Sequence, residues 1–459
     1  MAQKHIFIAA LIALVSSCGG TTNQHIRENP FLNGDAEPLS INITSNADTV
    51  RLNWSLQGEI DFDQYRIRIK DLGIERTVSR KETQCILTHV STYNAPVKCD
   101  VSLIKGSDAL TTQTLYLNID GLDASFLHNL MPDDGSSVCA GDGVYSIGLP
   151  DGRSVFLMGD SFICPVNGVS RSPYAHMYRN TYIVFDPRTK SVSPIYDFNG
   201  KGTNSSAAVP PGHYYEDKWY WPGHGFVAGN SLYVFQSLMY LAGAGMWGFA
   251  YENSNLLKYS LPDLKLQKDA PIQFRSDKEI HYGAAAFNNG DYIYIYAQVD
   301  ITNDLDAKTE VYCARALEAD LYGVWEYWNG TTWVKDSAAA TGLTGLSSVS
   351  VSSQFNVFKL KDKYVLLTKS KKLWEGEIYT FTSSNPQGPW GHKKVIYKVP
   401  AFTDSNLMSY NAMAHPQFEK DGMILVSYCM NTSDGDQQAR DVTTYRPRFF
   451  WVDINDILN

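Results

Sequence analysis

The sequence predicts an all-β protein in which a β-sandwich precedes a five-bladed β-propeller. Tyrosine and glycine are abundant, at 28 and 34 of 459 residues, and short runs of Val, Ile, Tyr and Phe alternate with turns of Asn, Gly and Asp. Stretches with the helical spacing of apolar residues are scarce. One hairpin pattern recurs five times in the C-terminal part of the chain, which is typical of a propeller.

The composition excludes several classes of protein. With 44% apolar and 19% charged residues, the chain can bury more than one core, so neither a disordered nor a fibrous protein is expected. Its 39 Lys and Arg against 48 Asp and Glu give a net charge of −9, and no basic run could follow a phosphate backbone. We therefore expect no nucleic-acid partner.

Residues 1–18 have the layout of a lipoprotein signal peptide. Lys4 precedes the apolar run IFIAALIALV, and small residues lead directly to Cys18. This arrangement resembles the lipobox of bacterial lipoproteins, in which the cysteine is lipidated; an ordinary cleaved signal with an incidental cysteine is the alternative. The resemblance implies a membrane anchor at Cys18, a polar linker over 19–36, and a location in the bacterial cell envelope, in the periplasm or on the outer-membrane surface.

Residues 37–121 contain seven short runs that resemble strands. Apolar and polar residues alternate over Val50–Trp54, and this segment resembles a fibronectin type III or immunoglobulin-like sandwich. We find no catalytic chemistry in it. Its two cysteines, Cys85 and Cys99, are expected on neighbouring strands, where an oxidising compartment would permit a disulfide.

The spacing of the remaining cysteines does not match that of metal ligands, so it indicates no metal centre. Cys139 and Cys164 form a second plausible bridge, and Cys313 and Cys429 are expected to be buried thiols. The acidic loop 300–310 lacks the spacing and the glycine of a calcium loop. We therefore expect no cofactor and no metal, with a structural calcium ion as the alternative that the sequence leaves open.

The propeller is predicted over residues 122–459. Each repeat combines small or aromatic residues, a turn with Asn, Gly, Asp or Lys, and a strongly apolar strand, and each is followed by a third strand. A large sandwich would have no reason to repeat this order five times. The five hairpins lie at 141–160, 223–236, 282–297, 353–368 and 411–428.

The repeats place polar residues at the centre of the predicted propeller, where the first strand of each blade lines the channel. A ring of polar groups among small residues offers the close approach and the convergent hydrogen bonds that a sugar needs. Each residue alone also has an ordinary structural interpretation, and a single histidine is more often part of a core. The aligned positions are Asp142, His224, Tyr282, Ser353 and Asn411.

The first hairpin carries two aspartates, Asp142 on its rising strand and Asp160 on its returning strand. A three-residue loop centred on Asp151 would pair them, with Cβ atoms roughly 5 Å apart, whereas a two-residue loop would pair Asp142 with Ser161. Like charges this close raise one pKa, which suits acid and base chemistry on a glycosidic bond. The sequence leaves both registers open.

A second segment, His213–Trp221, combines aromatic residues with carboxylates. Trp219 and Trp221 could stack on sugar rings, and Glu216 could supply a further carboxylate. An aromatic cluster packed between two blades is the alternative.

The propeller region resembles families of five-bladed propellers related to bacterial endo-D-arabinanases, among the propeller glycosidases. The resemblance implies that Asp142 and Asp160 are catalytic acids, although the Thr that usually follows the second aspartate is Ser161 here. Its motifs are GDGVYSIGLPDGRSVFLMGDSF (141–162), Arg179-Asn180-Thr181, WPGHGFVAGNSLYVF (221–235), HYGAAAF (281–287), VWEYWNGTTW (324–333), TSSNPQGPWG (382–391) and YNAMAHP (410–416).

These observations and the resemblance lead us to expect a glycoside hydrolase for an arabinan-like or other furanoside-containing polysaccharide, acting as a monomer. We expect Asp142 to be the base or nucleophile, Asp160 its partner and Glu216 a candidate acid. A non-catalytic glycan-binding lipoprotein and a propeller that docks proteins are the alternatives. The expected substrate-binding residues are Asn180, Trp219, Trp221, His224, His281, Tyr282, Tyr410, Asn411 and His415.

Overall fold

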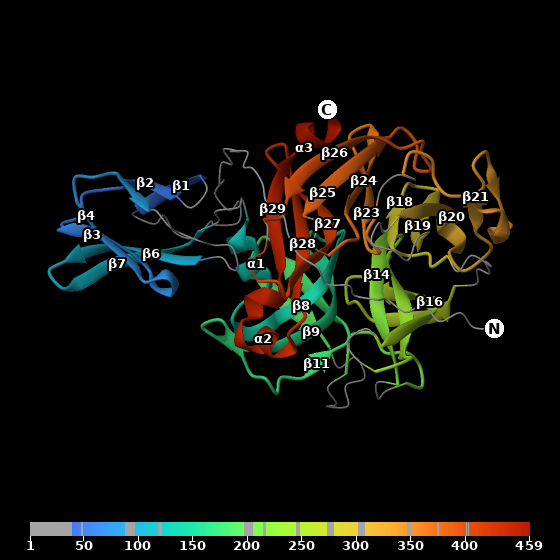
Figure 1. Cartoon of the computed structure of the whole chain (residues 1–459), viewed down its shortest axis with the longest axis horizontal. Coiled ribbons are helices and arrows are strands. Elements are labelled where there is room, and N and C mark those ends of the chain that lie inside the picture. The colour runs from blue at the N-terminus through green and yellow to red at the C-terminus, as the bar shows by residue number, and fades with distance from the viewer. Residues whose placement is uncertain are drawn as a thin grey trace. The chain divides into compact units, whose positions relative to one another are not determined.

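The computed structural model describes residues 39–46, 49–87, 97–117, 122–196, 205–213, 217–244, 248–272, 280–301, 308–346, 350–373, 376–400, 402 and 404–459. The predicted signal peptide, Cys18 and the linker at 19–36 lie outside the described residues. Within the described ranges most residues are in β-strands (Figure 1). No helix in these ranges is long and apolar enough to cross a membrane.

Two compact units divide the described residues. One comprises the described residues up to His128 together with Arg448–Trp451. The other comprises Asn129–Pro447 together with Val452–Asn459.

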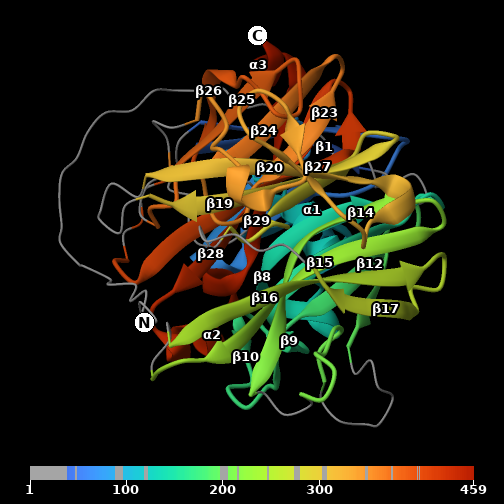
Figure 2. The same cartoon turned by 90° about the vertical axis from the view of Figure 1, so that its right-hand side faces the viewer.

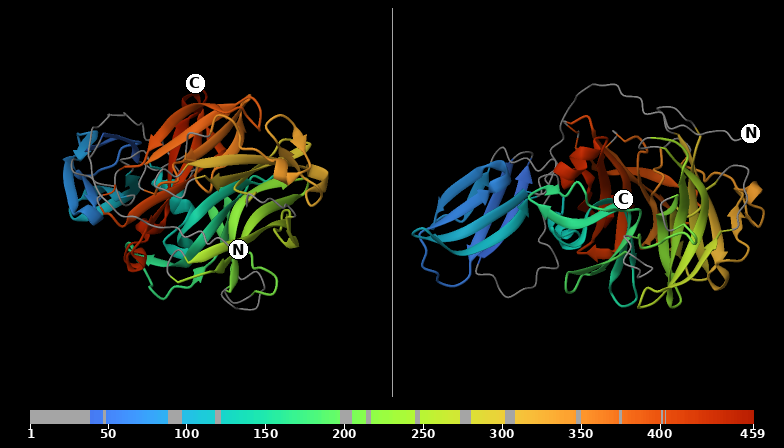
Figure 3. Two further views of the ribbon diagram at one scale, coloured as in Figure 1. Left: turned by 45° about the vertical axis from the view of Figure 1, so that its right-hand side comes forward. Right: turned by 90° about the horizontal axis from the view of Figure 1, so that it is seen from below.

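The first unit contains a sandwich of two antiparallel sheets, blue to cyan in Figure 3. Leu52 and Trp54 of one sheet and Ile67 and Val101 of the other belong to a single core, as the alternating pattern predicts. The first sheet has the order β1 (Leu39–Asn46), β2 (Thr49–Leu56) and β5 (Gln84–Leu87); the second has β4 (Ile74–Ser79), β3 (Gln64–Ile69), β6 (Val97–Lys105) and β7 (Asp108–Leu117), with η1 (Lys70–Leu72) between β3 and β4.

The two sandwich cysteines lie in different sheets, which corrects the prediction that they occupy neighbouring strands. Cys85 of β5 pairs with Leu52 of β2, whereas Cys99 of β6 pairs with Leu115 of β7. Both cysteines contribute to the core between the sheets. Burial raises the pKa of the Cys99 thiol to about 12.

Five antiparallel sheets follow the sandwich, one for each repeat found in the sequence. The first contains β8 (Asp134–Gly148), β9 (Ser154–Asn167), β12 (Thr181–Asp186) and β13 (Ser191–Ile195), with the short strands β10 (Ser170–Arg171) and β11 (Met177–Tyr178) on β9. The second contains β14 (Lys218–Ala228), β15 (Ser231–Leu241), β16 (Phe249–Ser260) and β17 (Leu266–Pro271).

The other three sheets follow the same plan, in which the strands are added in chain order. The third contains β18 (Ala285–Asn288), β19 (Tyr292–Asp300), β20 (Thr309–Leu317), β21 (Glu326–Trp328) and β22 (Trp333–Val334). The fourth contains β23 (Asn356–Leu360), β24 (Lys363–Lys369), β25 (Glu377–Ser383) and β26 (Gly391–Lys398), and the fifth β27 (Leu407–Lys420), β28 (Met423–Thr432) and β29 (Pro447–Asp453). Short helical segments lie at α1 (Ala124–Leu130), η2 (Glu318–Asp320), η3 (Ser337–Ala339), α2 (Gly435–Arg440), η4 (Val442–Tyr445) and α3 (Ile454–Leu458).

The first strands of the five sheets form the inner ring of the propeller. β8 contacts β14, β14 contacts β18, β18 contacts β23, β23 contacts β27, and β27 contacts β8 again. Figure 1 shows these strands around a common centre, and Figure 2 shows the same sheets at right angles to that view. This cyclic order confirms the fold class, a β-sandwich followed by a five-bladed propeller.

Glycines on and beside the inner strands let the second and third blades approach closely. The backbone N–H of His224 donates to the carbonyl of Gly283 at 2.9 Å, and a Cβ on Gly223 would lie 2.5 Å from the same oxygen. Apolar clusters fill the space between adjacent sheets. Because a blade is covered on both faces, its strands are continuously apolar, as over Val155–Met158.

Candidate active site

The register of the β8–β9 hairpin is that of a three-residue loop. The Leu149 N–H donates to the Arg153 carbonyl at 2.8 Å, which leaves Pro150–Gly152 as the loop. Gly152 has a φ of 88°, a conformation that glycine adopts without strain. This register brings Asp142 and Asp160 to the same level of the hairpin.

Asp142 itself lies at an irregularity of the sheet. Gly141 pairs with Ser161 and Gly143 with Met158, so Asp142 alone faces two residues of β9. The Oδ1 atom of Asp142 lies 2.5 Å from the position that a Cβ on Gly159 would take. A glycine at 159 therefore makes room for the carboxyl group.

Strained backbone follows Asp142 directly. Gly143 has a φ of 98° and Val144 a φ of 65°, and a β-branched residue rarely adopts a positive φ. Val144 is fully buried, so the surrounding core holds this conformation. Such strain is concentrated at functional sites, and here it turns the chain next to Asp142.

Asp142 is surrounded by tyrosines. The Tyr410 hydroxyl donates to Oδ2 of Asp142 at 2.6 Å, and the Tyr445 hydroxyl lies close to the same carboxyl group. Burial raises the pKa of Asp142 to about 7, and the nearby charge of Asp160 adds to this, while the hydrogen bond from Tyr410 opposes it. Asp142 can therefore gain and lose a proton near neutral pH.

Asp160 has the opposite surroundings. The Trp221 Nε1–H donates to its Oδ1 at 2.9 Å, and Arg179 donates to its Oδ2 at 3.3 Å. The side chains of Arg179 and Asp160 are 19% and 21% exposed, so the pair is mostly enclosed but still reaches solvent. With both oxygens accepting hydrogen bonds, one from a cation, Asp160 is held as a carboxylate.

Trp219 of the aromatic segment His213–Trp221 packs against Arg179, the cation beside Asp160. The Arg179 guanidinium lies 4.3 Å from the ring centroid of Trp219, which is itself buried. The Trp221 ring packs edge-on against Phe249 at 4.6 Å and remains partly exposed. Trp221, rather than Trp219, therefore keeps exposed surface that a ligand could contact.

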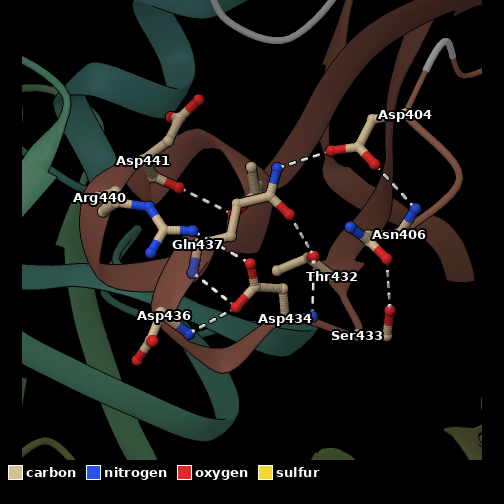
Figure 4. A network of polar contacts seen from close by, with 10 residues as sticks. Asp404, Asn406, Thr432, Ser433, Asp434, Asp436, Gln437, Arg440 and Asp441 are labelled. Atoms are coloured by element: carbon tan, nitrogen blue, oxygen red, sulfur yellow. Dashed lines mark hydrogen bonds and ion pairs between the residues drawn. The ribbon is translucent and has the colours of Figure 1, made fainter.

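The loop after β28 completes the surroundings of both aspartates. Tyr445 of η4 donates to the backbone carbonyl of Asp160 at 2.8 Å. Asn431, at the end of β28, donates to the Tyr410 hydroxyl at 3.1 Å. Figure 4 shows the polar network that holds the intervening loop, in which Asp434 accepts the N–H groups of Asp436 and Gln437.

Amide side chains lie further round the inner ring. Asn411, with a φ of 49°, donates to Gln354 at 2.7 Å and accepts from Ser352 at 3.0 Å. Gln354 also reaches the Pro222 carbonyl at 3.3 Å, so the fourth blade contacts the second across the ring. Asn411 and Gln354 are partly exposed and can supply hydrogen bonds to a ligand.

The chain matches one family over most of the propeller. Residues 133–454, more than half of the 459, match the model described as "Domain of unknown function (DUF5005)". The chain belongs to this family. No curated protein matches the chain.

A solved structure shares the fold of the DUF5005 domain, and two others match the chain at lower TM-scores. A Bacteroides ovatus protein described as a candidate hydrolase is 21% identical, with a TM-score of 0.60, over 74% of this chain and 90% of its own. A family 43 β-xylosidase/α-arabinofuranosidase from a compost metagenome is 12% identical, with a TM-score of 0.39, over 69% and 91%. An α-L-arabinofuranosidase of family 62 from Coprinopsis cinerea is 10% identical, with a TM-score of 0.38, over 69% and 92%.

Four residues that were predicted to bind substrate are buried in the core of the propeller. Asn180 is fully buried. Its Nδ2 donates to the carbonyls of Ala208 and Tyr220, and its Oδ1 accepts the Ala208 N–H. Tyr282 is 2% exposed, within the core between the second and third blades. The structure gives these two residues structural roles.

The two central histidines are also buried in this domain. His224 donates from Nδ1 to the Ala286 carbonyl at 2.5 Å, and burial lowers its pKa to about 4. His415 lies between the hydroxyls of Ser146 and Ser427, at 2.6 and 2.9 Å, and burial lowers its pKa to about 3. Both rings are therefore neutral at pH 7 and belong to the core.

The remaining predicted residues are placed as follows. His281 is exposed, and its ring stacks on that of Tyr251 with 3.5 Å between the ring centroids. Glu216 lies outside the described residues. Among the described residues, no group of three or more His, Cys, Asp and Glu side chains could hold a metal ion.

Sequence reasoning missed four residues of this site: Arg179, Gln354, Asn431 and Tyr445. Arg179 adjoins the predicted Asn180, and its charge beside a Trp-rich segment was a usable signal. Asn431 lies at the end of β28, and Tyr445 lies in η4, within the long segment between β28 and β29. Only the closed ring of blades brings that segment to Asp142 and Asp160.

Proposed function

We propose that this chain is a glycoside hydrolase whose reacting groups are Asp142 and Asp160. The observation that carries the proposal is the contrast between two carboxyl groups of one hairpin. Asp142 meets tyrosine hydroxyls and has a pKa of about 7, whereas Asp160 is held by Arg179 and Trp221. Pairs of acids in such different surroundings divide the roles of proton donor and carboxylate in glycosidases.

The surroundings favour Asp142 as the general acid, which exchanges the roles that we expected from the sequence. Asp142 would give its proton to the glycosidic oxygen as the bond from that oxygen to the anomeric carbon breaks. Asp160 would stabilise the positive charge that develops on the sugar. It would then either bond to the anomeric carbon or take a proton from the water that attacks it.

The substrate class that we propose is a furanoside-containing polysaccharide such as an arabinan. It is supported by the resemblance of the sequence motifs to those of endo-D-arabinanase-related propellers. Trp221 offers partly exposed aromatic surface next to Asp160, and Asn411 and Gln354 offer amide groups for sugar hydroxyls. Of the nine binding residues expected from the sequence, we keep Trp221 and Asn411 as ligand-binding residues.

Location and anchoring remain proposals from the sequence. We propose that Cys18 is lipidated and that the propeller acts in the bacterial cell envelope as a monomer. Metabolic labelling with an alkyne fatty acid tests this, because label should enter the wild type and be lost in Cys18→Ser. Equal labelling of both proteins would contradict the proposal.

The proposed activity is tested on a panel of plant, fungal and mycobacterial polysaccharides that includes arabinans. The protein, starting after Cys18, should release new oligosaccharides and reducing ends from at least one of them. A glycan that raises the melting temperature but is never cleaved would instead support a glycan-binding propeller. A panel that is neither cleaved nor bound would contradict both functions.

A further inference from the structure

The hydroxyl group of Tyr410 lies between two side chains that use it differently. It donates to Oδ2 of Asp142 at 2.6 Å and lies 3.1 Å from Nδ2 of Asn431. A phenol has a single hydrogen, so it can donate to only one of these neighbours. The orientation of the Asn431 amide therefore decides where that hydrogen points.

Two donors hold the Asn431 amide in one orientation. Its Oδ1 atom accepts the backbone N–H of Thr432 at 2.8 Å and the Nε2–H of Gln438 at 2.7 Å. A backbone N–H can only donate, so the atom of the amide that faces it is the oxygen. The NH2 group must then face Tyr410 as a donor, and the Tyr410 hydrogen is left for Asp142.

The loop that supplies Gln438 is itself fixed, as Figure 4 shows. Asp434 accepts two N–H groups at the start of α2 and pairs with Arg440 at 3.0 Å. Gln437 donates to Asp404 at 2.8 Å. These contacts hold the start of α2, where Gln438 lies next to Gln437, and connect it to the segment before β27.

We propose that Gln438, Asn431 and Tyr410 form a chain of hydrogen bonds with one fixed direction. This chain orients the Tyr410 hydroxyl so that it donates its hydrogen bond to Asp142. Tyr410 is then a positioning residue for this carboxyl group, not the substrate-binding residue expected from the sequence. The importance of Tyr410 for catalysis rests on the proposed function. The chain of hydrogen bonds is independent of that function.

Four titratable groups face Asp142 from the elements packed against it. They are Tyr410 of β27, Tyr445 of η4, Cys429 of β28 and Asp160 of β9. The hydrogen bond from Tyr410 lowers the pKa of Asp142, whereas burial and Asp160 raise it. Loss of the Tyr410 hydrogen should therefore move the titration of Asp142 to higher pH.

The test measures the protonated carboxyl band of Asp142 by difference infrared spectroscopy against pH, on the whole protein without substrate. The band is identified by its loss in Asp142→Asn. Tyr410→Phe removes the donor, and Asn431→Asp makes residue 431 an acceptor for the Tyr410 hydrogen. Each should raise the midpoint by about 1 pH unit or more, since a hydrogen bond to a charged group contributes about 1.5–3 kcal/mol.

Asn406→Asp is the matched control, because it adds the same charge to the network of Figure 4 but contacts Ser433 instead of Tyr410. Its midpoint should equal that of the wild type. An unchanged midpoint in folded Tyr410→Phe would overturn the proposal, as would an equal shift in Asn431→Asp and Asn406→Asp. If Tyr410→Phe does not fold, the comparison of the last two variants decides the question.

The readout also separates this inference from the proposed function, because it needs no substrate. A shifted midpoint in a protein that cleaves no glycan would reject the hydrolase and keep the chain of hydrogen bonds. Hydrolysis with an unshifted midpoint would reject the chain of hydrogen bonds and keep the hydrolase.

Discussion

Asp142 is the residue whose protonation matters most, because its pKa of about 7 lies within the range of an ordinary assay. If it acts as the general acid, kcat/KM should fall about tenfold per pH unit as the pH rises above about 7. His224 and His415 do not titrate there, since burial lowers their pKa values to about 4 and 3. A pH profile of kcat/KM measures this; a fall below pH 7 instead would make Asp142 the base.

Cys164, on the same hairpin as Asp142, also has a shifted pKa. Hydrogen bonding to Cys139, 2.9 Å away, lowers the pKa of the Cys164 thiol. Cys164→Ser therefore serves as the control for the pH profile. It should keep the fall above pH 7, because Asp142 and not Cys164 is the proposed proton donor.

The buried carboxyl group of Asp142 also makes stability depend on pH. Its pKa in the folded protein is higher than in the unfolded chain, so its contribution to stability is present at low pH and lost as the pH rises through about 7. Asp142→Asn removes the charge that is buried above pH 7. The melting temperature of the variant relative to the wild type should therefore rise between pH 4 and pH 8, and a constant or falling difference would contradict the pKa.

At the scale of single elements, the β8–β9 hairpin controls where Asp142 points. A Cβ at residue 159 would lie 2.5 Å from Oδ1 of Asp142, so Gly159→Ala should displace the carboxyl group. We expect kcat to fall at least tenfold, since a displacement of about 1 Å can cost about 100-fold. Gly391→Ala is the control, because a Cβ there meets no atom within 4 Å. Equal activity of both variants would show that Gly159 does not position Asp142.

The sequence predicted the hairpins well because each blade repeats one local pattern, and a repeated pattern needs no long-range information. It could not predict the bulge at Asp142, where the positive φ falls on Val144 and not only on glycine. It also could not separate core residues from ligand-facing ones within the polar ring. His415 and Asn411 occupy one strand, yet only Asn411 keeps exposed surface, because the burial of each depends on neighbouring blades.

At the scale of the whole molecule, we propose that the sandwich is dispensable for hydrolysis. The two aspartates and the residues that contact them all lie within Asn129–Pro447, which form one compact unit with the last residues of the chain. A chain that starts at residue 122 keeps α1, whose Phe126 packs on Phe449 at 4.8 Å. It should hydrolyse a soluble oligosaccharide with a kcat/KM within about twofold of the longer protein, whereas a folded but inactive chain would contradict this independence.

The boundary at residue 122 follows from contacts that the sequence does not reveal. Asp123 donates its N–H to the Phe449 carbonyl at 2.6 Å and accepts the Trp451 Nε1–H at 2.9 Å. Removing residues 122–130 would therefore expose part of β29. A chain that starts at residue 122, directly after the predicted end of the sandwich, keeps these contacts.

The central claim, that Asp142 and Asp160 are the reacting pair, is tested most directly by chromatography of the products from a cleaved polysaccharide. The wild type is compared with Asp142→Asn, Asp160→Asn and Asp151→Asn, the last being an exposed aspartate in the turn of the same hairpin. We predict a loss of at least about 100-fold in the first two variants and wild-type products from Asp151→Asn. Oligosaccharide release at the wild-type rate by a folded Asp142→Asn or Asp160→Asn protein would contradict the account.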